Sequence, residues 1–150
     1  MDILEKICEN KKKEIEFEKS KYSFNTLEKL VNIKPNKGFS KLLINKQKLQ
    51  KNNIVAEIKK SSPSAGNIIK DYNPIIIAKE YEKAGVHALS ILTEKKYFEG
   101  DIEHISSVKK YVQIPILRKD FIIDPYQVIQ SKFYEVDAIL IIMSIVSTQQ

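Results

Sequence analysis

The sequence predicts an α/β protein in which βα units surround a parallel sheet, preceded by a helical extension. From Asn53 onward, short apolar runs of strand length alternate with amphipathic stretches of helix length, which is typical of repeated βα units. The chain has 150 residues, of which 43% are hydrophobic and 29% charged. A chain of this length and composition can bury the core of one domain, and it is neither disordered nor collagen-like.

Residues 1–52 form the predicted helical extension. Ile3, Ile7 and Ile15 recur at helical spacing among charged residues. A second amphipathic pattern follows Ser23, a break comes at Pro35–Gly38, and a short third helix is expected at 39–43. We expect the extension to form a polar surface layer, with the lysines of 11–13 and 34–51 on a solvated face.

Residues 53–150 contain four predicted strands and three predicted helices. Asn73 is the expected N-cap of the first of these helices, Pro74 is its first residue, and Ala84-Gly85 ends it. The Ser/Pro/Gly segment before Asn73 is expected to be a loop. The predicted strands are 54–59, 87–92, 114–117 and 137–143, and the predicted helices are 73–83, 102–109 and 125–133.

Charge and cysteine content narrow the class of protein. The net charge of +6 comes almost entirely from lysine, and Arg118 is the only arginine. Nucleic-acid readers rely on arginine and on interleaved aromatic residues, so we expect no nucleic-acid partner and instead a surface that attracts small anions. The single cysteine, Cys8, allows no intrachain disulfide. Without a bilayer-length apolar run or a signal-peptide pattern, a cytoplasmic location is expected.

Charged side chains stand at the ends of two predicted strands. Glu57 and Lys59 lie two residues apart and so on one face of the first strand, and Lys119 follows the third strand. In parallel βα proteins, ligands bind at the carboxyl ends of the strands, so these three side chains are candidates for one pocket. The alternative is that they are strand-end charges in solvent, paired with one another.

Four segments, in order, resemble the indole-3-glycerol phosphate synthase family. They are Val55–Ser64 (VAEIKKSSPS), Leu89–Gly100 (LSILTEKKYFEG), Pro115–Gln127 (PILRKDFIIDPYQ) and Asp137–Ile142 (DAILII). The extension also resembles the segment that family members carry ahead of their (βα)8 TIM barrel. In one departure from the family pattern, Glu135-Val136 stands where Gly-Ala is usual.

The resemblance implies a reaction without metal or cofactor. A carboxyphenylamino deoxyribulose phosphate is closed to an indole with loss of carbon dioxide and water. By resemblance, Lys119 is the general acid, Lys59 holds the substrate carboxylate and assists dehydration, and Glu57 orients the lysines and moves protons. One acid with two lysines suits a doubly anionic phosphosugar substrate.

The resemblance also implies substrate-binding residues. Ser62 corresponds to a loop serine near the phosphate, and an apolar slot for the aromatic ring is formed by Phe98, Phe121, Leu140 and Ile142. Each has a structural alternative: a serine can cap a turn, aromatic residues can belong to the core, and strand residues fill a barrel interior. His87 and His104 are expected to be structural or exposed.

Residues 53–150 correspond to only the first four strands of the family barrel, so its second half is expected to be absent. Such a half barrel leaves two strand edges unpaired and is expected to self-associate or to be complemented by a second half. The alternative function is therefore a non-catalytic half barrel that acts as an assembly or interaction module.

Overall fold

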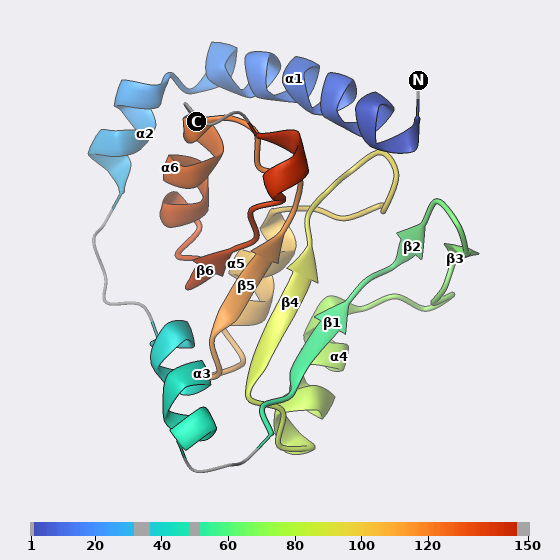
Figure 1. The fold of residues 1–150 in the computed structure, drawn as a ribbon, viewed down its shortest axis with the longest axis vertical. Coiled ribbons are helices and arrows are strands. Elements are labelled where there is room, and N and C mark those ends of the chain that lie inside the picture. Colours follow the sequence, from blue (N-terminus) through green and yellow to red (C-terminus); the bar gives the residue numbers. More distant parts are fainter. Residues whose placement is uncertain (1, 32–36, 49–51, 147–150) are drawn as a thin grey trace.

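The computed structural model describes residues 2–31, 37–48 and 52–146, without the side chains of 45–48. A parallel four-stranded sheet in the order β1-β4-β5-β6 lies at its centre (Figure 1). The strands are β1 (Val55–Ile58), β4 (Ala88–Leu92), β5 (Ile116–Lys119) and β6 (Ala138–Ile139). All three pairings are parallel, and the strands follow one another in chain order. The predicted α/β class with a parallel sheet is therefore confirmed.

Three helices connect the strands, as predicted. They are α4 (Pro74–Lys83), α5 (Glu103–Lys109) and α6 (Pro125–Phe133). Alternate strand residues, among them Ile58, Leu89 and Ile116, are fully buried in one cluster with residues of α4 and α5. Because strand side chains alternate between faces, the residues between them point to the opposite face of the sheet. This alternation separates the core from the site described below.

Local chemistry sets the helix starts. The Asn73 side chain accepts hydrogen bonds from the amides of Ile75 and Ile76, and Pro74 occupies the first turn of α4. Asp124 forms a reciprocal capping box with Gln127 at the start of α6. The predicted end of α4 also holds, because Gly85 adopts the left-handed conformation, with φ +84°.

The extension contains α1 (Ile3–Lys21), α2 (Phe24–Leu30) and α3 (Phe39–Lys48). Helix α1 runs across the ends of the strands, and α2 lies beside α6 (Figure 1). Ile15 and Leu27 form a second buried cluster with Ile123 and Tyr126. The extension thus contributes to the core, whereas a surface layer was expected.

Several elements differ from the sequence prediction. The expected loop after β1 contains a two-stranded antiparallel ribbon, β2 (Ser61–Ser62) and β3 (Gly66–Asn67). Strand β5 starts at Ile116, two residues late, since Pro115 has no amide hydrogen to donate to the ladder. Strand β6 covers two residues and is followed by the 3-10 helix η1 (Met143–Ile145), where a longer strand was expected. Helix α3 extends past the expected 39–43.

Among the described residues, no helix combines the length and the apolar character needed to cross a membrane.

Candidate active site

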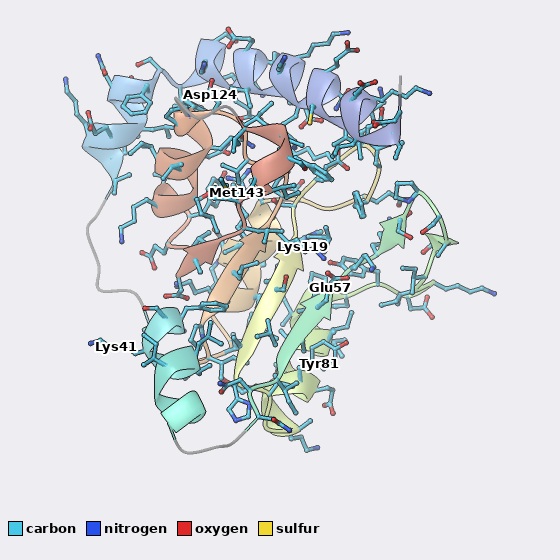
Figure 2. The ribbon with its side chains drawn as sticks, in the orientation of Figure 1. Lys41, Glu57, Tyr81, Lys119, Asp124 and Met143 are labelled. Carbon is cyan, nitrogen blue, oxygen red and sulfur yellow. The ribbon has the colours of Figure 1, made fainter. Side chains whose placement is uncertain are left out.

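Glu57, Lys59 and Lys119 form one ion-paired cluster. Glu57 Oε1 lies 2.7 Å from Lys59 Nζ, and Glu57 Oε2 accepts a hydrogen bond from Lys119 Nζ. Strand β4 separates β1 from β5, so the Lys119 side chain reaches across β4 to Glu57 (Figure 2). The register explains the meeting, because Glu57 aligns with Ser90, and Leu92, two residues further along β4, aligns with Lys119. The convergence of these three side chains matches the sequence expectation.

The cluster is half-buried and charged. Burial raises the pKa of the Glu57 carboxyl, but the hydrogen bonds and charges of Lys119 and Lys59 outweigh burial and leave that pKa below its ordinary value. Glu57 therefore stays ionised at neutral pH. Two ammonium groups that share one carboxylate have donors left over for an anionic ligand, since each ammonium carries three N–H groups.

The loop after β4 is organised by a buried carboxylate. Glu94 is fully buried, and its side chain accepts hydrogen bonds from the amides of Lys96, Tyr97 and Phe98 at 3.1, 2.7 and 3.0 Å. The amide of Gly100 donates to the Glu94 carbonyl at 2.8 Å, which closes the loop. Sequence reasoning assigned Glu94 no role. An acidic residue directly before a short loop was the available signal.

Two of the predicted aromatic residues lie together. The rings of Phe98 and Phe121 have centroids 6.1 Å apart and are tilted by 38°. Phe98 comes from the loop that Glu94 holds, and Phe121 follows Lys119 by two residues. Both side chains are half-buried, so the pair offers an apolar surface next to the end of β5.

Three further residues were predicted to bind the substrate, namely Ser62, Leu140 and Ile142. Ser62 lies in β2, and its Oγ accepts from the amide of Ala65 at 3.2 Å, as expected of a serine that caps a turn. Leu140 and Ile142 follow β6 and are half-buried, and the Leu140 amide donates to the Arg118 carbonyl at 3.2 Å. Their binding roles remain predictions.

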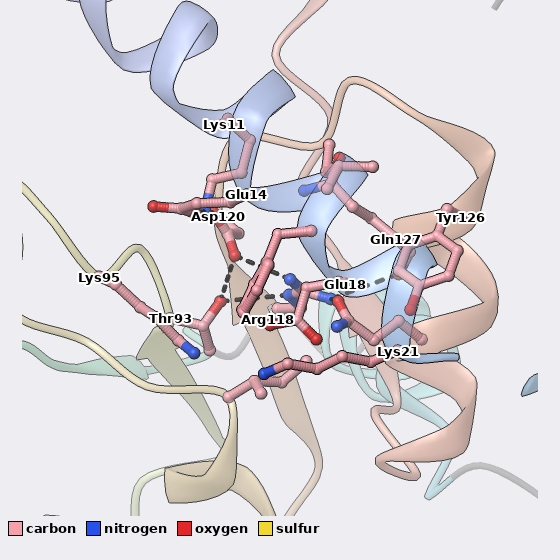
Figure 3. A pocket seen from close by; sticks show the side chains of 14 residues that line it. Lys11, Glu14, Glu18, Lys21, Thr93, Lys95, Arg118, Asp120, Tyr126 and Gln127 are labelled. Carbon is pink, nitrogen blue, oxygen red and sulfur yellow. Dashed lines mark hydrogen bonds and ion pairs between the residues drawn. The ribbon is translucent and has the colours of Figure 1, made fainter. Parts of the chain in front are cut away.

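A second cluster of charged side chains lies on the face of the sheet opposite the Lys119 side chain. Arg118 and Asp120 are both buried, at 4% and 2% exposure, and their side chains join at 2.8 Å. Asp120 Oδ2 also accepts from Thr93 Oγ1 at 2.6 Å, and Asp120 Oδ1 lies 3.0 Å from Lys11 Nζ of α1 (Figure 3). Burial raises the pKa of Asp120, but the charges of Arg118 and Lys11 and the hydrogen bonds from Thr93 and Arg118 lower it to about 2.

The position of Lys11 in this cluster differs from the sequence prediction. Lys11 was expected on a solvated face with Lys12 and Lys13, but it is 4% exposed. Lys11 is buried because it pairs with the Asp120 carboxylate, which lies far from it in the sequence.

A cavity of about 230 Å³ lies next to Arg118 and is lined by residues of α1, of α6 and of the ends of β4 and β5 (Figure 3).

The histidines lie outside the cluster, in agreement with the sequence expectation. His87 Nδ1 accepts from the Ile54 amide at 3.1 Å, and the His104 ring packs on Tyr72 with centroids 5.5 Å apart. Within the part of the chain that the structure describes, no group of three or more His, Cys, Asp or Glu side chains is placed to hold a metal ion.

The parallel sheet of βα units, with acidic and basic side chains at its carboxyl edge, defines the class of this protein as α/β. Comparison with known proteins gives the family. The family model described as indole-3-glycerol phosphate synthase matches residues 4–150, so the chain belongs to this family. The resemblance noted in the sequence is thereby confirmed.

Individual relatives agree with the family assignment, and each is named indole-3-glycerol phosphate synthase. The relative from Aliarcobacter butzleri is 43% identical over 143 residues, which cover 93% of this chain and 54% of that protein. The one from Thermoanaerobacter pseudethanolicus is 45% identical over 145 residues, or 95% of this chain and 54% of that protein. The one from Alkaliphilus metalliredigens is 40% identical over 149 residues, or 99% and 56%. The chain thus spans about half the length of the curated relatives it matches.

Proposed function

We propose that this chain carries catalytic residues of an indole-3-glycerol phosphate synthase, an enzyme of tryptophan biosynthesis. The substrate of this proposal is 1-(2-carboxyphenylamino)-1-deoxyribulose 5-phosphate, an anionic phosphosugar, and the reaction is ring closure with loss of carbon dioxide and water. The observation that carries the proposal is the sharing of the Glu57 carboxylate by Lys59 and Lys119 in a member of this family.

The proposed chemistry assigns a role to each group of the cluster. The aryl carbon that bears the carboxylate attacks the ketone carbon, a carbon–carbon bond forms, and Lys119 Nζ gives a proton to the carbonyl oxygen as negative charge develops there. Loss of carbon dioxide restores the aromatic ring. The new hydroxyl then leaves as water, and the carbon between the hydroxyl-bearing carbon and the ring nitrogen loses a proton as the indole double bond forms.

Lys59 and Glu57 support these steps. The Lys59 ammonium is proposed to hold the substrate carboxylate and to assist departure of the hydroxyl group. Glu57, which is kept ionised by both lysines, is proposed to orient them and to accept the proton released during dehydration. No step in this scheme requires a metal or an organic cofactor.

The proposed substrate contacts extend beyond the cluster. Phe98 and Phe121 lie together and are proposed to face the aromatic ring of the substrate, with Leu140 and Ile142 completing this apolar slot. Ser62 is proposed to approach the phosphate. Water exclusion by such a slot would strengthen the ionic contacts, because charges interact more strongly in a medium of low dielectric constant.

We propose that residues 53–150 form the first four strands of a TIM barrel and that residues 1–52 form a helical extension ahead of it. We also propose that the protein is cytoplasmic. In the described sheet, β1 and β6 are the edge strands. These are the edges at which further strands, or a second copy of the chain, would add. The family match and the ion-paired cluster favour catalysis over a non-catalytic assembly module.

Turnover of the named substrate tests the proposal. The chain is assayed alone and together with the part of the Aliarcobacter relative that it does not match, supplied as a second polypeptide, and the fluorescence of indole-3-glycerol phosphate is followed. We expect product in the presence of the second polypeptide, with Glu57→Gln much slower. A stable complex of the two polypeptides that forms no product would refute the proposal.

A further inference from the structure

Lys11 differs from the other lysines of its helix. It is 4% exposed, whereas its neighbours Lys12 and Lys13 are exposed to solvent. A buried ammonium is stable only when it is paired, and Lys11 Nζ lies 2.8 Å from Glu14 Oε2 and 3.0 Å from Asp120 Oδ1. Burial lowers the pKa of Lys11, but the two carboxylates outweigh burial and raise it, so the ion pair is charged at neutral pH.

The Asp120 carboxylate joins Lys11 to the strand end that carries Lys119. Asp120 follows Lys119 directly, and its Oδ1, the oxygen that Lys11 contacts, also accepts from the Phe121 amide at 2.8 Å. Its Oδ2 accepts from Arg118 at 2.8 Å and from Thr93 Oγ1 at 2.6 Å (Figure 3). The carboxylate therefore contacts residues on both sides of it in β5 and its following loop, a residue that follows β4, and a residue of α1. These partners are Arg118, Phe121, Thr93 and Lys11.

The main chain of Lys119 is held from the same side. The Lys119 carbonyl accepts from the Thr93 amide at 3.0 Å, and the Thr93 hydroxyl is the group that donates to Asp120. Because side chains alternate along the strand end, Arg118 and Asp120 point behind the sheet while Lys119 points toward Glu57. A shift of Asp120 therefore changes the direction of Lys119.

We propose that Lys11 is a positioning residue for Lys119: through Asp120, the N-terminal helix fixes the strand end that directs the Lys119 ammonium to Glu57. The consequence for the reaction rests on the proposed function of Lys119, whereas the mechanical coupling between the two lysines does not. Helix α1 is in this way part of the active-site architecture, although Lys11 itself contacts Asp120 and Glu14, not Glu57.

Lys11→Met is a suitable test because the other contacts that hold Asp120 and helix α1 remain in this variant. Arg118 still pairs with Asp120, and Thr93 and the Phe121 amide still donate to that carboxylate. Helix α1 keeps the buried Ile7 and Ile15, and Lys19 Nζ still contacts Asp124 Oδ2 at 2.9 Å. The matched control is Lys12→Met, which removes an exposed lysine next to Lys11 on the same helix. Lys11→Arg is the conservative variant expected to restore the contact.

The coupling is measured by the rate at which acetic anhydride modifies each lysine, followed by mass spectrometry. Lys119 is protected by its contact with Glu57, and the internal reference is Lys109, which contacts Asp137 at 3.4 Å in another part of the molecule. In Lys11→Met we expect the rate at Lys119 to rise several-fold and that at Lys109 to stay constant. Lys12→Met and Lys11→Arg should resemble the original chain.

Two results of the modification experiment would overturn the inference. An unchanged rate at Lys119 in Lys11→Met would show that the two lysines are not coupled. An equal rise at Lys119 and Lys109 would show that Lys11 supports the fold in general and does not position Lys119. Neither result depends on turnover, so both are informative even if the proposed reaction fails.

Turnover in the two-polypeptide assay supplies the second readout. In Lys11→Met we expect kcat to fall on the order of 10-fold, because a displaced proton donor is less effective in the transition state. KM should change little, since the substrate-binding groups stay in place. If the original chain forms product and Lys11→Met has the same kcat, the inference fails while the proposed function stands. If the original chain forms no product with its partner bound, the proposed function fails and the modification rates alone decide the coupling.

Discussion

The buried Asp120 carboxylate is expected to make stability depend on pH in a specific range. Its pKa is lowered from 3.8 to about 2 by Arg118 and Lys11. At more than about 1 kcal/mol per pH unit, the ionised carboxylate stabilises the folded chain by about 2–3 kcal/mol relative to its protonated form. Asp120 is almost completely buried, so screening by solvent reduces this value little.

The sign follows from the direction of the pKa change. A carboxyl group whose pKa is lower in the folded state contributes its full stabilisation above the unfolded pKa and loses it as the pH falls toward the folded pKa. Asp120→Asn keeps the shape of the side chain and removes its charge. We therefore expect the variant to be less stable than the original chain by about 2–3 kcal/mol at pH 7 and by about half of that at pH 3.

Urea unfolding followed by circular dichroism at pH 7, 5, 4 and 3 measures this difference. Asp71→Asn, at an exposed position, is the control, and its effect should stay within about 0.5 kcal/mol at each pH. If Asp120→Asn lowers the free energy of unfolding by the same amount at pH 7 and at pH 3, the charge of Asp120 does not stabilise the fold and the prediction is wrong.

Three further substitutions test other parts of the structure by the same unfolding measurement. Gly100→Ala should destabilise by about 1–3 kcal/mol, because its new Cβ would lie 2.5 Å from the Leu92 carbonyl oxygen, and an unchanged midpoint would contradict this packing. Glu94→Gln should cost about 1–3 kcal/mol, since an amide nitrogen cannot accept the hydrogen bonds that a carboxylate oxygen accepts from the loop amides. Glu135→Gly should stabilise the fold by about 0.5–1 kcal/mol, because Glu135 has φ +56°, a conformation that favours glycine. A loss of stability would show that the Glu135 side chain contributes more than the backbone strain costs.

The elements that were predicted correctly from the sequence are those that depend on interactions between neighbouring residues. Asn73-Pro74 and Asp124-Pro125 start helices because their side chains cap the first-turn amides, which depends on only a few neighbouring residues. The meeting of Glu57 with Lys119 was also predictable. It follows from the two-residue alternation along strands and from the common direction of parallel strands.

The features that sequence missed depend on contacts with distant residues. Lys11 has the same sequence surroundings as Lys12 and Lys13, and only the presence of Asp120 across the fold selects it for burial. The role of Glu94 depends on a loop that folds back over its own carboxylate. The short β6 could not be predicted because its apolar run has the same composition as a longer strand.

The binding roles of Ser62, Leu140 and Ile142 remain predictions for a related reason. Ser62 is engaged in a local turn, and the apolar residues after β6 are half-buried; both features suit a structural role and a binding role equally. A bound substrate distinguishes the two.

The role of Lys119 as general acid is tested by the single-turnover rate of indole formation for Lys119→Met in the two-polypeptide assay. The matched control is Lys110→Met, at an exposed position at the end of α5. If Lys119 is the general acid, its removal should slow the reaction by about 10²–10⁴-fold while Lys110→Met keeps the original rate. Equal rates for Lys119→Met, Lys110→Met and the original chain would show that Lys119 is not the general acid.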